Sequence, residues 1–88
     1  MPIVTKEVTI LSAQGLHARP AAMFVQIVSK YNSHVTIEKD GERVNGKSIM
    51  GILTLGAYKN SKVTIEAKGD DAEEVVRDLE VLLTKEEV

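Results

Sequence analysis

The residues best suited to chemistry are His17 and Arg19, which stand where a loop meets an amphipathic segment. A helix beginning at Ala18 has backbone N–H groups without intrahelical acceptors and a partial positive charge, so an anion is stabilised there. The same field disfavours a charged imidazolium, so a neutral, nucleophilic ring is expected at His17. Together with the Arg19 guanidinium and the N–H groups of Ala18 and Arg19, this suits reversible attack on a phosphoryl group. From spacing alone, a simple helix-capping residue beside a surface arginine is the more economical interpretation.

Ser48 is the second candidate, because it precedes a short apolar segment, residues 49–55, and suits the N-cap of a helix there. A regulatory phosphate is the alternative role. A helix start would tolerate its roughly −1.5 to −2 charge, and Lys47 would partly compensate it. The apolar Ile49, Met50 and Leu53 could be core or an exposed docking patch, and Met50 suits an adaptable interface.

The composition excludes several other kinds of site. The chain has no cysteine, so disulfides and thiolate metal sites are excluded. His34, the only other histidine, has no metal-ligand spacing to a partner and is interpreted as structural. We therefore expect no metal and no cofactor. No signal-peptide pattern and no apolar run of the roughly 20 residues that span a membrane are present, which fits a cytoplasmic protein without membrane insertion.

Charge is distributed unevenly along the chain. Residues 1–65 carry eight Lys/Arg and four Asp/Glu (+4), and residues 66–88 carry three and nine (−6), which gives −2 in total. The basic part holds His17 and could face an acidic partner or a phosphate, although ordinary surface charge with an acidic last helix is the simpler interpretation. With 3% aromatic residues and a weak positive charge, a nucleic-acid groove is not expected.

Four strands are predicted from alternating apolar and polar residues, at 6–11, 35–38, 42–44 and 63–68. Asp40-Gly41 predicts a two-residue type I′ hairpin, which needs positive φ at both positions. The hairpin joins the second and third strands into one antiparallel unit.

Three helices are predicted, over residues 18–31, 49–55 and from 72 to about 83. The first has an apolar face at Ala18, Ala21, Ala22, Val25 and Val28, widened by Phe24, Ile27 and Tyr31. In the last, Asp70 or Asp71 is the expected cap, with Glu73 or Glu74 as capping-box partner; its buried stripe is Val75, Val76, Leu79, Leu82 and Leu83. The order βαββαβα predicts an α+β open-faced two-layer sandwich in one domain, 1–88: a four-stranded antiparallel sheet with three helices on one face.

Two segments together resemble a known family. Residues 15–21, Gly-Leu-His-Ala-Arg-Pro-Ala, resemble the active-site motif of the histidine-containing phosphocarrier protein (HPr) of the bacterial phosphoenolpyruvate:sugar phosphotransferase system. Residues 45–51, Asn-Gly-Lys-Ser-Ile-Met-Gly, resemble the motif around that family's regulatory serine. The resemblance extends from Lys6 to Leu83. It implies a sandwich of four antiparallel strands and three helices, in agreement with the predicted order.

The resemblance implies that His17 accepts a phosphoryl group on Nδ1 from enzyme I, which takes it from phosphoenolpyruvate, and passes it to IIA domains of sugar permeases. Arg19 would stabilise the group. Ser48 would be modified by an ATP-dependent serine kinase/phosphorylase, which slows transfer from enzyme I, and the product could act as corepressor for a catabolite-control transcription factor. The protein would be a monomeric carrier rather than an enzyme. Its expected docking residues are Ala22, Lys47, Ile49, Met50 and Leu53.

The family has two paralogous branches that the sequence distinguishes. The catabolite-repression branch lacks the active-site histidine, so His17 argues against it. The nitrogen-related branch departs from the Lys-Ser-Ile-Met-Gly pattern that is intact here, so the sugar branch is favoured. Leu53 stands where some members carry methionine, which affects only the detail of partner affinity. A regulatory binding module centred on Ser48 and a structural domain without chemistry are the competing hypotheses.

Overall fold

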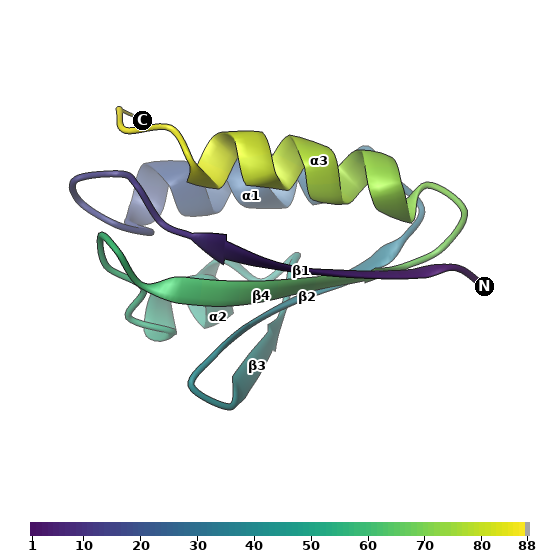
Figure 1. Ribbon diagram of the computed structural model, residues 1–88, viewed down its shortest axis with the longest axis horizontal. Helices are drawn as coiled ribbons and strands as arrows, with labels where there is room; N and C mark the ends of the chain where they lie inside the picture. Colours follow the sequence, from purple (N-terminus) through teal and green to yellow (C-terminus); the bar gives the residue numbers. More distant parts are fainter. Residues whose placement is uncertain (88) are drawn as a thin grey trace.

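The computed structural model describes residues 1–87 (Figure 1). Its elements follow the predicted order: β1 (Ile3–Thr9), α1 (Ala18–Ser29), β2 (His34–Lys39), β3 (Glu42–Asn45), α2 (Ile49–Thr54), β4 (Lys62–Lys68) and α3 (Ala72–Leu83). Strand β1 lies earlier in the chain than predicted. It ends at Thr9, the last residue in register with β4, opposite Lys62. The Ile10 N–H still donates to the Ser61 carbonyl at 2.9 Å, and the next N–H, that of Leu11, donates to the Leu83 carbonyl at 3.1 Å.

The four strands form one antiparallel sheet in the order β1-β4-β2-β3. Val8 lies opposite Val63, and Ile65 lies opposite Ile37. All four side chains are buried beneath the helices. Figure 1 shows α1 and α3 running side by side across this face. The smaller α2 packs against α1 and β3. The predicted open-faced α+β sandwich is confirmed.

The turn between β2 and β3 has the predicted conformation. Asp40 has φ 52° and Gly41 has φ 84°. Positive φ at both central residues is what a type I′ turn requires, and this turn matches the twist of the strands it joins.

The buried face of α1 is rotated from the predicted one. Ala21, Phe24 and Val28 are buried, whereas Ala18 is exposed and Ala22 is half-buried. The large Phe24 side chain sets which direction faces the sheet. At about 100° per residue, Ala18, six residues before Phe24, lies roughly 120° around the helix from it. The expectation that Ala18 is a core residue was therefore wrong.

The predicted buried stripe of α3 is confirmed, with Val75, Val76, Leu79, Leu82 and Leu83 all buried. The predicted capping box is wrong. Asp71 occupies the N-cap position, but its carboxylate makes no capping hydrogen bond. It accepts instead from the Asn32 N–H at 2.8 Å, the Ser33 N–H at 3.0 Å and the Ser33 hydroxyl. Asp71 thus joins the start of α3 to the turn before β2, because the three donors of that turn outcompete the free N–H groups of α3 itself.

Asp71 makes the stability of the fold depend on pH. Hydrogen bonds from the Ser33 hydroxyl and the Asn32 N–H hold the pKa of Asp71 below its usual value of 3.8. Because the folded-state pKa is the lower one, its stabilising contribution is complete above about pH 4 and is lost as pH falls through the folded pKa. Urea unfolding between about pH 5 and pH 2 should therefore show a smaller acid-dependent loss of stability in Asp71→Asn than in the native protein.

The matched control is substitution of the neighbouring Asp70, which is exposed, because Asp70→Asn removes the same charge as Asp71→Asn. Asp70→Asn should keep the native pH dependence of stability. Equal flattening in both variants would contradict the assigned role of Asp71.

Candidate functional site

The loop between β1 and α1 is anchored just before His17. The Leu16 N–H donates to the Ala57 carbonyl at 2.8 Å, and the Leu16 side chain is buried. Gly15 has φ 69°, and a Cβ there would lie 2.4 Å from the Ala57 carbonyl oxygen. Only glycine permits this approach. Contact with the loop that follows α2 therefore fixes the direction in which the chain enters α1.

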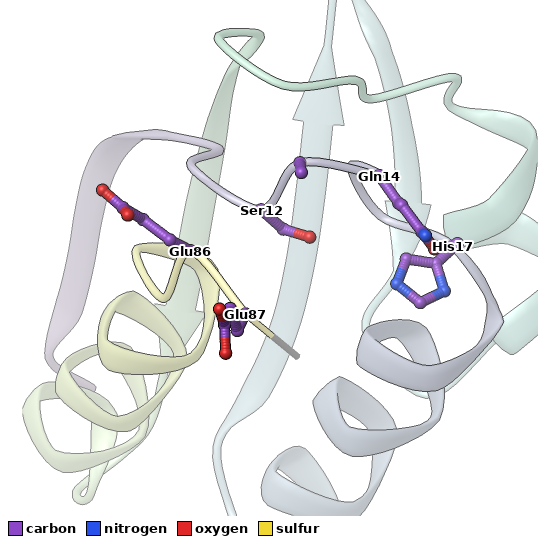
Figure 2. Close-up of a pocket in the computed structure, with 6 residues that line it drawn as sticks. Ser12, Gln14, His17, Glu86 and Glu87 are labelled. Atoms are coloured by element: carbon purple, nitrogen blue, oxygen red, sulfur yellow. The ribbon is translucent and has the colours of Figure 1, made fainter.

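His17 is the N-cap residue of α1, with extended backbone angles of φ −82° and ψ −170°. Its carbonyl accepts the Ala21 N–H at 3.0 Å. Its side chain makes no capping hydrogen bond, so the simple capping role does not account for the imidazole. The half-buried ring lines a cavity of about 210 Å³ together with Ser12, Ala13, Gln14, Glu86 and Glu87 (Figure 2).

The first turn of α1 carries uncompensated positive potential. The first helical hydrogen bond comes from Ala21, so the N–H groups of Ala18 and Arg19 precede the helical ladder. No acidic residue occupies this turn. The Arg19 side chain is exposed and forms no ion pair within residues 1–87. The expected donors are thus uncommitted and lie next to the ring in sequence.

Ser48 occupies the predicted N-cap position of α2. Its Oγ accepts the Gly51 N–H at 3.0 Å, so the capping prediction is confirmed. The loop before it is fixed by Asn45, whose side chain accepts the Lys47 N–H at 2.8 Å and whose carbonyl accepts the Ser48 N–H at 3.0 Å. Ser48 itself is only partly buried.

The apolar residues of α2 divide between core and surface. Ile52 is fully buried, whereas Ile49 is 40% and Met50 71% exposed; Leu53 is half-buried. Of the two alternatives left open by the sequence, Ile49 and Met50 therefore belong to a surface patch rather than to the core. Figure 1 shows α2 at the same end of the molecule as the start of α1, and the two helices are in contact.

The other histidine lies away from the His17 cavity. His34 is exposed at the start of β2, opposite Lys68 of β4. Within residues 1–87, no three side chains of histidine, aspartate or glutamate are grouped to hold a metal ion. None of the described helices has the length and apolar character needed to cross a membrane.

Five other residues that line the His17 cavity were not predicted from the sequence as part of the site: Ser12, Ala13, Gln14, Glu86 and Glu87. Gln14 is close to His17 in sequence and could have been named. The glutamates could not, because they follow α3 and reach the site only through tertiary contacts.

Comparison with known proteins places this site in context. The family model described as "PTS HPr component phosphorylation site" matches residues 4–85. A curated relative, the HPr-like protein Crh of Halalkalibacterium halodurans, is 42% identical over 84 residues, which cover 96% of this chain and 100% of the relative.

Solved structures with the same fold include HPr proteins. The phosphocarrier protein HPr from Bacillus anthracis str. Ames has a TM-score of 0.89 and 43% identity, covering 94% of this chain and 99% of that one. HPr from Thermoanaerobacter tengcongensis has a TM-score of 0.85 and 46% identity, covering 100% of both chains. Bacillus subtilis Crh, described as a domain-swapped dimer, has a TM-score of 0.75 and 40% identity over 97% of this chain and 98% of that one.

Proposed function

The chain belongs to the HPr family of the phosphotransferase system, and from this membership we propose that it carries a phosphoryl group on His17. The supporting observation is that the His17 side chain is uncommitted at the start of α1, where an anion is stabilised. Residues 1–88 would act as one phosphocarrier domain. The protein would turn over nothing alone, because both donor and acceptor are other proteins.

The proposed step is a displacement at phosphorus. The Nδ1 lone pair of His17 attacks, the N–P bond forms, and the bond between phosphorus and the donor breaks with its electron pair remaining on the donor. The phosphoryl oxygens would then accept hydrogen bonds from the Arg19 guanidinium and from the backbone N–H groups of Ala18 and Arg19. Transfer to the next acceptor is the same step in reverse. The proposed donor is phosphorylated enzyme I, and the proposed acceptors are IIA domains of sugar permeases.

The test is incubation with phosphoenolpyruvate and enzyme I, followed by mass spectrometry at neutral pH. A single acid-labile, base-stable phosphoryl group on His17 is expected. Labelling at another residue, or no labelling, would contradict the proposal.

A regulatory role is the second candidate, favoured by the relationship to Crh and by the accessible Ser48. The presence of His17 supports the carrier, because the catabolite-repression branch of the family lacks that histidine. The two roles are compatible in one chain. A phosphate on Ser48 would place negative charge beside Ile49 and Met50, where it would oppose docking of enzyme I. The phosphoserine form would be a corepressor for a catabolite-control transcription factor.

Ser48→Ala should have two separable effects. Loss of the bond to the Gly51 N–H is expected to lower the free energy of unfolding by about 1 kcal/mol, measured by urea titration. The variant should also accept no acid-stable phosphate from ATP and the serine kinase. Ser29→Ala, which removes an exposed hydroxyl from α1, is the control and should still be phosphorylated at Ser48. Retention of acid-stable phosphate by Ser48→Ala would refute the assignment.

The proposed docking surface consists of Ala22, Lys47, Ile49, Met50 and Leu53. Its support is the exposure of Ile49 and Met50 and the contact between α1 and α2. Lys47 is exposed at the edge of this apolar area. An apolar centre with a basic margin fits an acidic partner surface.

We also propose that the protein works in the cytoplasm as a monomer. Solved structures of relatives include dimers, namely HPr from Thermoanaerobacter tengcongensis and Bacillus subtilis Crh. Sedimentation of the full chain at micromolar concentration tests the monomer directly.

A further inference from the structure

The segment after α3 folds back onto the loop that leads to His17. The Leu11 N–H donates to the Leu83 carbonyl at 3.1 Å, and the Ala13 N–H donates to the Glu86 carbonyl at 3.4 Å. These bonds bring Glu86 and Glu87, here called the acidic segment, to the wall of the His17 cavity. Figure 2 shows the acidic segment on one side of the cavity and His17 on the other.

The charges of the acidic segment are uncompensated in the described part of the chain. Neither carboxylate forms an ion pair within residues 1–87. In Figure 2 the Glu86 carboxylate points away from the ring, so its influence on the ring acts through space rather than by contact. Arg19 does not line this cavity. A phosphoryl group on His17 would therefore lie beside a cavity whose wall carries Glu86 and Glu87, both without an ion-pair partner within residues 1–87, while Arg19 lies outside that wall.

Resting on the carrier function above, we propose that Glu86 and Glu87 raise the transfer potential of the phosphoryl group on His17. A phosphoryl group adds about two negative charges, and like charges close together raise the free energy of that state. This repulsion is absent from the unphosphorylated protein. The acidic segment therefore shifts the equilibrium away from phospho-His17 and towards the acceptor, whereas the α1 N-terminus and Arg19 shift it the other way.

The equilibrium can be measured without any partner protein. Phosphoramidate, a small chemical donor, would phosphorylate the imidazole. Exchange with free imidazole then breaks the N–P bond at His17 and forms an N–P bond on the free ring. The exchange constant is the equilibrium constant of this transfer. Phosphorus NMR gives the exchange constant for the native protein and for Glu86→Gln/Glu87→Gln.

The doubly neutralised variant should favour phospho-His17 by about three- to tenfold over the native protein at low ionic strength. The exchange constants of the variant and the native protein should become nearly equal at about 1 M salt, where the Debye length falls to roughly 3 Å. The matched control is Glu73→Gln/Glu74→Gln, which removes the same charge from the first turn of α3, at the other end of that helix. This control variant should keep the exchange constant near the native value.

Each outcome decides the proposal. Equal constants for the native protein and the Glu86/Glu87 variant would overturn it, as would an equal change in the control or a difference that persists in high salt. The carrier function would survive those results. If phosphoramidate labels His17 but enzyme I does not, the carrier function fails and the present proposal is still decided by the exchange constant. No label on His17 from either donor overturns both.

Discussion

His17→Ala is expected to abolish phosphoryl acceptance from phosphoenolpyruvate and enzyme I, with the residual signal at the assay background. Alanine has no nucleophilic nitrogen, and no other residue of the cavity wall carries an imidazole. The measurement is transfer of labelled phosphate with saturating enzyme I, resolved by mass spectrometry at neutral pH.

The loss should be chemical and not structural. Because the His17 side chain makes no capping hydrogen bond, its removal should change the free energy of unfolding by about 1 kcal/mol or less. The other histidine provides a matched control, since His34 is exposed on β2. His34→Ala should accept label at the native rate. Substantial labelling of His17→Ala would show that the acceptor lies elsewhere.

Met50→Glu is expected to produce the second largest effect, a drop of about 10- to 100-fold in kcat/KM for transfer from enzyme I. Met50 is 71% exposed on α2, and burying a new carboxylate in an apolar interface costs binding free energy of the order of a hot-spot residue, about 2 kcal/mol. The fold should tolerate the change, because a negative charge in the first turn of a helix is favourable.

Chemical phosphorylation separates docking from chemistry in this variant. Phosphoramidate should label His17 in Met50→Glu as readily as in the native protein. Val81→Glu is the matched control, because Val81 is also an exposed apolar residue, at 53%, but lies on α3. It should leave transfer from enzyme I near the native rate. A similar loss in both variants would show that general surface charge, not this patch, governs docking.

Local patterns predicted much of this fold because the interactions that decide them span only a few residues. The Asp40-Gly41 turn needs two consecutive residues that accept positive φ. The Ser48 cap needs a hydroxyl three residues before a free N–H group. The buried stripe of α3 follows from helical periodicity.

The failed predictions concern residues whose partners are distant in the chain. Asp70 or Asp71 was expected to cap α3, but the Asp71 carboxylate binds three donors in the turn at Asn32 and Ser33, and no local pattern reveals them. Ala18 was expected in the core, but the direction of the α1 face is set by how Phe24 packs on the sheet. In both cases tertiary packing outweighs the local preference.

The same distinction between neighbouring and distant contacts applies to the candidate site. Neighbouring residues alone predict that His17 begins a helix, that Arg19 follows in its first turn and that Ser48 caps a second helix. Three other features emerge only when the chain is folded: the His17 side chain makes no capping hydrogen bond, Met50 is exposed while Ile52 is buried, and Glu86 and Glu87 reach the His17 cavity. Those features depend on how the sheet, α1, α2 and the segment after α3 meet, and long-range contacts of this kind leave no periodic trace in the chain.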